Sequence, residues 1–303
     1  MMLVFAGTPE VAVPALDALV ASSHDVVAVL TRPDAPAGRG RRLTPSPVAA
    51  RAEELGIEVL KPAHPRDPEF QARLAELGAD ACAVVAYGAL LPQSALDIPP
   101  RGWVNLHFSL LPRWRGAAPV QRAIMAGDDE IGTASFRIVR ELDAGDVYLL
   151  ESRPMPDATA GEVLASLAES GARQLVSAMD LVEAGATPTP QPAEGVTLAA
   201  KITVDDARLD FRRGAAELRN QVMGCSPDPG AWCELDGQRF KVFRARVGGP
   251  EGLAPGELAA TKRELFVGTG DGAVELLEVQ APGKRRMPAV DWARGGVSGK
   301  RLA

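Results

Sequence analysis

The sequence predicts an α/β fold, with a mainly parallel, doubly wound sheet in the front part of the chain and a smaller β-rich domain after it. Short apolar runs alternate with amphipathic helical patterns through residues 1–183. This alternation is typical of a parallel sheet that helices cover on both faces. Beyond a proline-rich segment the pattern changes to one helical stretch and several β-rich runs, which indicates a second domain.

The front part consists of strand-like runs separated by helical patterns. The runs lie at residues 3–7, 26–31, 57–60, 81–86, 103–108, 133–139 and 147–152. The helical patterns lie at residues 9–22, 46–55, 68–77, 117–126 and 160–183. Because a helix separates most successive runs, we expect the strands to pair mainly in parallel.

Alternating prolines mark the boundary between the two domains. Pro188, Pro190 and Pro192 stand in the segment GATPTPQPAEG, and this spacing favours an extended, semi-rigid chain. The part that follows contains the helical stretch RRGAAELRNQVMG and the β-rich runs AWCELDG, RFKVFRARV, ELFVGTG and AVELLEVQ. A small barrel of the OB type is predicted there, with a sandwich as the alternative. We therefore expect a front domain at 1–185, a linker at 186–204 and a C-terminal domain at 205–303.

Composition excludes several classes of protein. The chain has 303 residues, of which 46% are hydrophobic and 24% charged, and its three cysteines are scattered. This composition is ordinary for a globular protein, and so few cysteines favour a reducing cytoplasm over a disulfide framework. The first basic residue is Arg32, and no run of about 18 apolar residues occurs, so neither a signal peptide nor a membrane span is predicted. We expect a cytoplasmic monomer without a membrane partner.

The net charge of −6 hides an asymmetry along the chain. Residues 1–205 contain 17 basic and 26 acidic residues, whereas residues 206–303 contain 16 basic and 13 acidic ones. The front part therefore carries −9 and the C-terminal part +3. A modestly basic region is compatible with a polyanionic partner, although on charge alone a solvated surface is the simpler interpretation.

Two polar side chains stand on the strand predicted at 103–108. Asn105 and His107 are two residues apart, so in an extended chain they point to one face, near the carboxyl end where open α/β sheets bind ligands. An asparagine amide can donate to a developing oxyanion, and a histidine can move a proton near neutral pH. The pair is suited to addition at a carbonyl group, and a structural histidine is the alternative.

A carboxylate is expected close to this pair. Asp143 lies in the segment ELDAGD, past the end of the run at 133–139. There it would orient the imidazole and stabilise its cationic form, although a plain turn also explains the segment. The sequence has no nucleophile elbow and no metal-ligand motif, so we expect no metal and a nucleophile that belongs to the substrate.

The neighbouring loops predict a ligand pocket. The loop at 109–116 would cover a cleft opposite the apolar segment at 84–91, and such a cleft suits a flat aromatic ligand, unless the apolar segment is merely core. The turn after the first strand lacks the Gly-x-Gly-x-x-Gly pattern, and no Walker A sequence occurs. A dinucleotide-dependent oxidoreductase is therefore not expected.

The chain carries a series of motifs that resemble one enzyme family. They are FAGTPE (5–10), RPDAPAGRGRRLTPSPV (32–48), VVAYGALLP (84–92), NLHFSLLPRWRGAAPVQRAI (105–124), ELDAGD (141–146) and LLEVQAPGKRRM (276–287). On these motifs the chain resembles the methionyl-tRNA formyltransferase family nearly from end to end. Two departures are modest: Phe108 replaces a usually small residue, and Glu-Leu-Asp-Ala-Gly replaces the commoner Gly-Leu-Asp-Thr-Gly.

The resemblance implies a fold and a reaction. It implies a Rossmann-type formyltransferase catalytic domain at 1–185 and an OB-like tRNA-binding domain at 205–303. The reaction would move the formyl group of 10-formyltetrahydrofolate, used as cosubstrate, to the α-amino group of methionyl initiator tRNA for translation initiation. The alternatives are another 10-formyltetrahydrofolate-dependent formyltransferase or hydrolase, and a noncatalytic RNA-binding protein.

The resemblance also implies roles for individual residues. The catalytic set would be Asn105, His107 and Asp143. The folate would contact Val85, Ala86, Tyr87, Gly88, Leu90, Leu91, Ser109, Leu110, Leu111 and Pro112. The tRNA would contact Arg39, Arg41 and Arg42 in a loop longer than a strand-to-helix connection needs, and Lys284, Arg285 and Arg286 near the C-terminus. For both basic clusters a solvated surface is the alternative.

Overall fold

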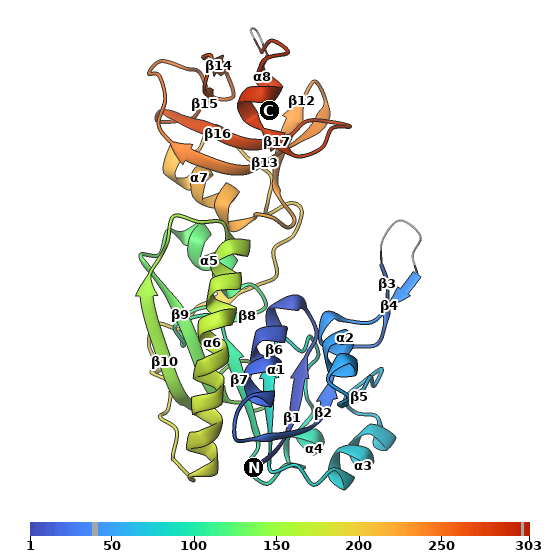
Figure 1. The fold of residues 1–303 in the computed structure, drawn as a ribbon. Coiled ribbons are helices and arrows are strands. Elements are labelled where there is room, and N and C mark those ends of the chain that lie inside the picture. The colour runs from blue at the N-terminus through green and yellow to red at the C-terminus, as the bar shows by residue number, and fades with distance from the viewer. Residues whose placement is uncertain (38–41, 298–299) are drawn as a thin grey trace. The chain divides into compact units, whose positions relative to one another are not determined.

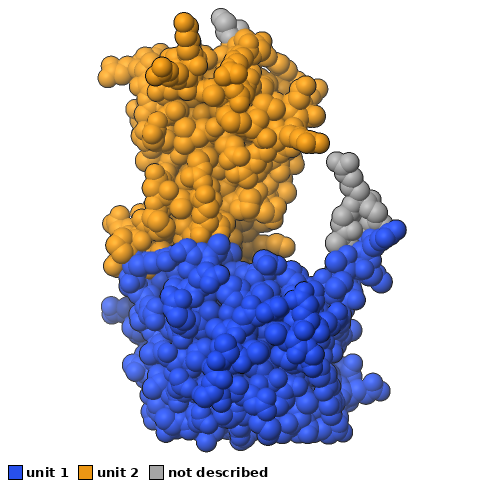
Figure 2. Space-filling model, viewed as in Figure 1, with its two compact units in different colours: residues 1–116, 132–153, 164–198 blue, residues 117–131, 154–163, 199–303 orange. Residues whose placement is uncertain are grey.

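The computed structural model describes residues 1–37, 42–297 and 300–303. Within these ranges the chain forms two compact units (Figure 2). Unit 1 comprises residues 1–116, 132–153 and 164–198, and unit 2 comprises residues 117–131, 154–163 and 199–303. No helix among the described residues is long and apolar enough to cross a membrane.

The predicted doubly wound sheet is present, and its strands match the apolar runs of the sequence (Figure 1). Its order is β10-β9-β7-β6-β1-β2-β5. The neighbours from β7 to β5 pair in parallel, and β9 is antiparallel to β7, so the prediction of a mainly parallel sheet is confirmed. The strands are β1 (Met2–Gly7), β2 (Asp25–Leu30), β5 (Glu58–Leu60), β6 (Ala81–Val85), β7 (Trp103–His107), β9 (Glu130–Arg137) and β10 (Val147–Pro154).

Burial explains why the central strands have continuous apolar runs. Every residue of β6 is buried, as is every residue of β1 after Met2, because helices cover both faces. The edge strand β10 has no buried residue and carries Glu151 and Arg153, which is how exposed sheet edges avoid pairing with other chains.

Local signals fix the ends of the helices that connect these strands. The hydroxyl of Ser46 caps α2 by accepting a backbone N–H at 3.0 Å, and the carboxylate of Asp67 caps α3 at the same distance. The pattern at 9–22 begins as a 3-10 turn before α1, because Pro14 lacks the N–H that an uninterrupted helix would use. The helices are η1 (Glu10–Ala12), α1 (Val13–Val20), α2 (Pro47–Glu54), α3 (Pro68–Glu76), α4 (Gln93–Leu96), α5 (Pro119–Ala126) and α6 (Ala160–Glu183).

Helix α6 packs directly on the strand that carries Asn105 and His107. A Cβ added to Gly171 would lie 2.9 Å from the Leu106 side chain, so the glycine permits this close approach. The amide of Gln174 donates to the backbone oxygen of Thr133 at 3.2 Å and ties α6 to β9. Because Leu106 faces α6, its neighbours Asn105 and His107 point to the other face of the sheet.

Two short pairs of strands lie outside the seven-stranded sheet. In the loop that carries the motif at 32–48, β3 (Ala35–Ala37) pairs antiparallel with β4 (Arg42–Thr44). Arg39 and Arg41 lie outside the described residues. The other pair is β8 (Arg115–Gly116) with β11 (Leu198–Ala199), so the chain after the prolines returns beside the loop that follows β7.

Unit 2 consists mostly of strands, as predicted for the C-terminal domain, and these strands pair antiparallel. The sheet order is β12-β13-β16-β15-β14, and β17 pairs with β16. Helix α5 packs on α7, where a Cβ added to Gly224 would lie 2.5 Å from the Met125 side chain. The elements are α7 (Ala215–Gly224), β12 (Ala231–Leu235), β13 (Gln238–Val247), β14 (Leu258–Ala260), β15 (Leu265–Gly268), β16 (Ala273–Gln280), β17 (Met287–Pro288) and α8 (Ala289–Ala293).

The last residues of the chain join the two edges of this sheet. Ala303 donates its N–H to the oxygen of Glu234 in β12 at 2.9 Å, and Leu302 donates to Gly256, just before β14, at 2.9 Å. β12 and the segment leading into β14 thereby gain a partner, as edge strands do in a barrel. This closure supports the predicted small barrel over the sandwich.

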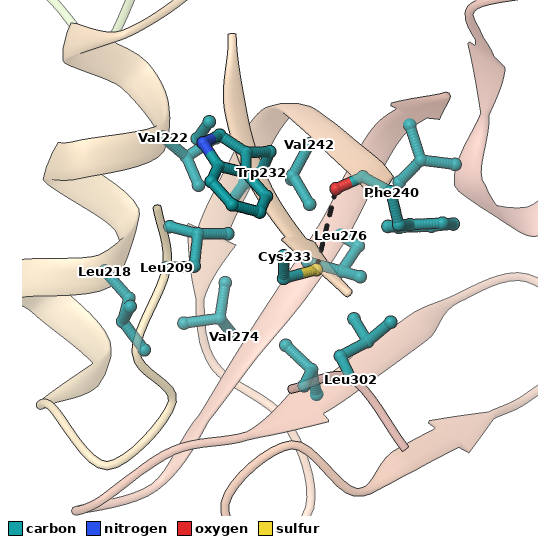
Figure 3. Packing of buried hydrophobic residues seen from close by; sticks show 14 of the residues in the cluster. Leu209, Leu218, Val222, Trp232, Cys233, Phe240, Val242, Val274, Leu276 and Leu302 are labelled. Atoms are coloured by element: carbon teal, nitrogen blue, oxygen red, sulfur yellow. Dashed lines mark hydrogen bonds between the residues drawn. The ribbon is translucent and has the colours of Figure 1, made fainter. Parts of the chain in front are cut away.

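The core of unit 2 is apolar, and Figure 3 shows part of it around Trp232 and Cys233. Two of the three cysteines belong to this core. Trp232 packs among Leu209, Val222 and other aliphatic side chains, and its indole N–H donates to Val204 O at 2.6 Å. Cys225 and Cys233 are fully buried free thiols, and burial raises the pKa of Cys225 to about 12. They are therefore inert packing residues.

Candidate active site

Strand β7 places Asn105 and His107 side by side on one face of the sheet. Across the antiparallel pairing, Asn105 lies opposite Phe136 and His107 lies opposite Ala134. The ring of His107 meets the ring of Phe136 edge-on, with centroids 6.3 Å apart. His107 is 6% exposed while Asn105 is partly exposed, so the amide is the more accessible of the two groups.

Asp143 completes the constellation from the connection between β9 and β10. Its Oδ2 lies 3.9 Å from Nδ1 of His107, and the same oxygen accepts the backbone N–H of Gly116 at 2.7 Å. Asp143 has a φ of 47°, in the left-handed region that ordinary residues adopt rarely. The backbone turn therefore aims the carboxylate at the imidazole.

The second nitrogen of His107 is held by the loop that follows the strand. Nε2 lies 2.9 Å from the backbone oxygen of Trp114. A carbonyl oxygen only accepts, so Nε2 carries hydrogen, and Nδ1 faces the Asp143 carboxylate. The two ring nitrogens of His107 are therefore fixed between the carbonyl oxygen of Trp114 and the carboxylate of Asp143.

The turn that holds Asp143 is fixed by a glutamine outside the predicted catalytic segments. The amide of Gln191 donates to the backbone oxygens of Asp143 and Gly145, both at 2.8 Å. Its own oxygen accepts from the guanidinium of Arg115 at 2.8 Å. A Cβ added to Gly145 would lie 1.7 Å from the oxygen of Arg137, so glycine is required at this position. Gln191 stands between two prolines in a segment that was predicted to be a linker. The restricted backbone between the prolines was the only sequence signal that its side chain holds a fixed position.

The loop after β7 folds over the face that carries the catalytic candidates. Leu111 packs against Ala134 and Phe136, the residues opposite His107 and Asn105. The hydroxyl of Ser109, which is fully buried, donates to the oxygen of Arg113 at 2.7 Å and closes the loop. Leu110 and Pro112 are partly exposed, so these two residues remain accessible.

Comparison with known proteins defines the family. Residues 1–179 match the model "Formyl transferase", and residues 201–296 match "Formyl transferase, C-terminal domain". A methionyl-tRNA formyltransferase of Streptomyces coelicolor is 61% identical over 97% of this chain and 96% of its own length. One from a Nocardioides species is 59% identical over 97% of this chain and 95% of its own length.

The chain belongs to the methionyl-tRNA formyltransferase family. Among solved structures, HypX from Aquifex aeolicus in complex with tetrahydrofolic acid shares its fold, with a TM-score of 0.68 and 20% identity over 98% of this chain. This chain spans 47% of the length of HypX.

In this formyltransferase chain, the segment after β6 alternates between buried and exposed residues. Val85 and Tyr87 are buried, and Tyr87 belongs to the apolar core of unit 1. Ala86 and Gly88 are exposed and have φ values of 48° and 84°, and Leu90 is 83% exposed. Burial raises the pKa of the Tyr87 hydroxyl, and the nearby positive charge of Arg32 offsets only part of this rise. Tyr87 thus supports the segment from beneath, while the exposed residues face outward.

A network of hydroxyl groups joins this segment to the start of the loop that carries the motif at 32–48. Oγ1 of Thr8 donates to Tyr87 O at 2.7 Å and accepts the N–H of Arg32 at 3.3 Å. Thr31, which is fully buried, makes a hydrogen bond of 2.7 Å to Ser46, the cap of α2. The sequence did not single out Thr8, although it lies in the FAGTPE motif, and it links three strand ends.

The predicted tRNA contacts of this formyltransferase differ in how their charges are used. Arg42 is exposed on β4 in unit 1. In unit 2, Arg286 forms an ion pair with Glu278 and lies over the ring of Phe243 at 4.4 Å. Lys284 and Arg285 are exposed and form no ion pair with any described residue. Lys284 and Arg285 are therefore more available to a phosphate than Arg286 is.

Proposed function

We propose that this chain transfers the formyl group of 10-formyltetrahydrofolate to the α-amino group of methionyl initiator tRNA. The observation that carries the proposal is the arrangement of Asn105, His107 and Asp143 at the end of β7, with 3.9 Å between His107 Nδ1 and Asp143 Oδ2. The names of relatives at 59% and 61% identity support the same reaction. The product would be formylmethionyl-tRNA, made in the cytoplasm for translation initiation.

The acceptor of this reaction supplies its own nucleophile. The lone pair of the deprotonated α-amine attacks the formyl carbon, the C–O π pair moves to oxygen, and a tetrahedral oxyanion forms. Collapse of this intermediate breaks the bond to N10 of the folate, which takes up a proton as it leaves. The protein therefore has to position two substrates, stabilise the oxyanion and move protons.

The three candidate residues match these tasks. The accessible amide of Asn105 donates to the formyl oxygen as negative charge develops there, a contribution worth about 10²–10³ in rate for such donors. His107 accepts the proton that the amine loses, or stabilises the oxyanion as a cation. Asp143 orients His107 and favours its cationic form.

The folate is proposed to lie between the segment after β6 and the loop after β7. The exposed backbone and side chains of Ala86, Gly88 and Leu90 offer one wall, and Leu110 with Pro112 offers another. Their apolar character suits the flat ring of a pterin. The remaining predicted folate contacts, Val85, Tyr87, Leu91, Ser109 and Leu111, would act from behind this surface, because the structure buries them wholly or in part.

The tRNA is proposed to contact basic residues in both units. Arg39, Arg41 and Arg42 would hold the phosphates and splayed bases at its single-stranded end, and Lys284, Arg285 and Arg286 would contact its backbone. If this assignment is right, replacing Arg42 should weaken tRNA use while folate binding stays unchanged.

One assay separates this function from its nearest alternatives. Purified protein, 10-formyltetrahydrofolate carrying a labelled formyl group, and either charged initiator tRNA or small sugar amines would be mixed, and the labelled products counted. Transfer to the tRNA that His107→Ala abolishes supports the proposal. Transfer only to small amines, or release of free formate, would instead identify another formyltransferase or a hydrolase.

A further inference from the structure

A buried histidine lies far from the candidate active site without a hydrogen-bond partner for its ring. The side chain of His24 has no exposed surface, and neither ring nitrogen makes a hydrogen bond with any described residue. His24 immediately precedes β2, at the amino end of that strand, whereas His107 stands at the carboxyl end of β7. Because β2 and β7 run in the same direction, the two histidines are at opposite edges of the sheet.

Two carboxylates from the last turn of α6 face this histidine. Oδ1 of Asp180 lies 3.2 Å from Nε2 of His24, and Oε2 of Glu183 lies 3.7 Å from Nδ1. The spacing of three residues puts both carboxylates on one face of the helix. One ligand atom from each of the three residues can be chosen so that all lie within 4.8 Å of one another.

These distances are close to those of a metal centre. Nitrogen and oxygen ligands lie about 2.0–2.2 Å from zinc, so two ligands of a tetrahedral ion are about 3.4 Å apart. His24 and Asp180 already have that separation, at 3.2 Å. Glu183 faces the other ring nitrogen, Nδ1, and its Oε1 accepts from the N-terminal ammonium of Met1 at 2.9 Å. Its side chain is 47% exposed, so it can rotate away from that ammonium to join Asp180 on the Nε2 side.

The chemistry of the three ligands selects the class of ion. One imidazole with two carboxylates suits zinc and its neighbours among the transition metals, whereas magnesium and calcium prefer oxygen ligands alone. The carboxylates are about half exposed, at 57% for Asp180, so an ion and its remaining water ligands can reach the site from solvent.

We propose that His24, Asp180 and Glu183 form a binding site for a divalent transition-metal ion, with zinc as the best match. The ion would give the buried imidazole a directional ligand bond in place of the hydrogen bond that neither carboxylate makes with it, and it would tie the end of α6 to the start of β2. Sequence spacing could not reveal the site, because His24 is distant in the chain from the two acids. The site is separate from formyl transfer and does not depend on the proposed function.

The test is zinc binding by the purified full-length protein after treatment with a chelator. Titration with zinc chloride, followed calorimetrically, should show one saturable site, and zinc should raise the thermal midpoint. Asp180→Asn and Glu183→Gln change exposed side chains, so they should fold normally and each weaken zinc binding about tenfold or more. His24→Ala should abolish the site.

Two matched variants control for surface binding. Glu169→Gln removes another exposed acid of α6, and His64→Ala removes an exposed histidine, and both should bind zinc as the wild type does. Wild-type binding no tighter than that of His24→Ala would overturn the proposal. A loss of stability in Asp180→Asn that is the same with and without zinc would also overturn it, because it would show a metal-free ion pair. X-ray absorption at the zinc edge should report one nitrogen among oxygen ligands.

Discussion

The backbone N–H of Gly116 and the carboxylate of Asp143 form a hydrogen bond of 2.7 Å, and the oxygen that accepts it is the one facing His107. The loop after β7 thus holds the same oxygen of Asp143 that faces the imidazole of His107. The orientation of the carboxylate is set before any substrate binds, so the charge of Asp143 can be tested separately from its position.

Asp143→Asn should keep the position and remove the charge. The amide oxygen can still accept from Gly116, but it stabilises a protonated His107 much less than a carboxylate does. We expect kcat for formyl transfer to fall by about 10²-fold or more, with little change in the thermal midpoint. Steady-state kinetics with charged initiator tRNA would measure this, and a normal kcat would rule out the role proposed for Asp143.

Asn105→Ala should remove the proposed oxyanion donor. We expect a fall in kcat of about 10²–10³-fold, because the lost interaction forms as charge develops in the transition state. KM for the folate should change little. An increase in KM with an unchanged kcat would mean that Asn105 binds substrate equally in the ground state, and the proposed role would then be wrong.

Gln191→Ala should disturb the active site although the residue lies in the proline-rich segment. Its amide makes two hydrogen bonds of 2.8 Å to the turn that carries Asp143. Their loss should cost about 1–3 kcal/mol locally and lower kcat, because the carboxylate is no longer held toward His107. Gln238→Ala, an exposed glutamine in unit 2, is the matched control and should leave kcat unchanged. Equal effects of the two changes would contradict this explanation.

Gly145→Ala should displace the same turn by steric overlap. The new Cβ would lie 1.7 Å from a backbone oxygen, which cannot move as a flexible side chain does. We expect a loss of about 2–4 kcal/mol in the free energy of unfolding, together with a lower kcat. Gly272→Ala meets no atom within 4 Å and serves as the control in urea denaturation. If both variants unfold at the same urea concentration, the turn is not constrained as described.

Unit 2 should lose stability in acid as the carboxylate of Asp206 becomes protonated. Its pKa lies below the ordinary 3.8, first because the backbone N–H of Thr203 donates to the carboxylate, and further because of Arg122. A lowered pKa means that the stabilisation is complete above about pH 4 and is lost as the pH falls below that value. Asp206→Asn should therefore reduce stability at pH 7 and flatten its decline between about pH 4 and 2. Thermal unfolding across this range would show it, with Asp205→Asn, which changes an exposed neighbour, as the control.

Much of the fold followed from periodicity, because strands buried on both faces require continuous apolar runs. β6 is an example, since every one of its residues is buried. The short elements β14, β17 and α8 were missed because so few residues show no period. β14 and β17 form through pairing with longer strands, and α8 packs on β16. The packing of α5 in unit 2 depends on contact with α7, which local sequence does not encode.

In the candidate site, too, local sequence pattern predicts some placements and tertiary contacts determine the others. The placement of Asn105 and His107 on one face follows from the two-residue period of a strand. The approach of Asp143 to His107 depends on a left-handed backbone conformation and on Gln191, which are contacts between distant segments. The metal site at His24 is likewise a product of tertiary structure. The family, and with it the tRNA, came from the resemblance of whole motifs.

The closure of unit 2 by residues 301–303 has a consequence for handling the protein. Without these residues, β12 and the segment leading into β14 would present unpaired N–H and C=O groups to solvent. Exposed strand edges of this kind form hydrogen bonds with strands of other molecules. Shortening the chain by a few residues at this end would therefore favour self-association long before it affected the formyl-transfer chemistry.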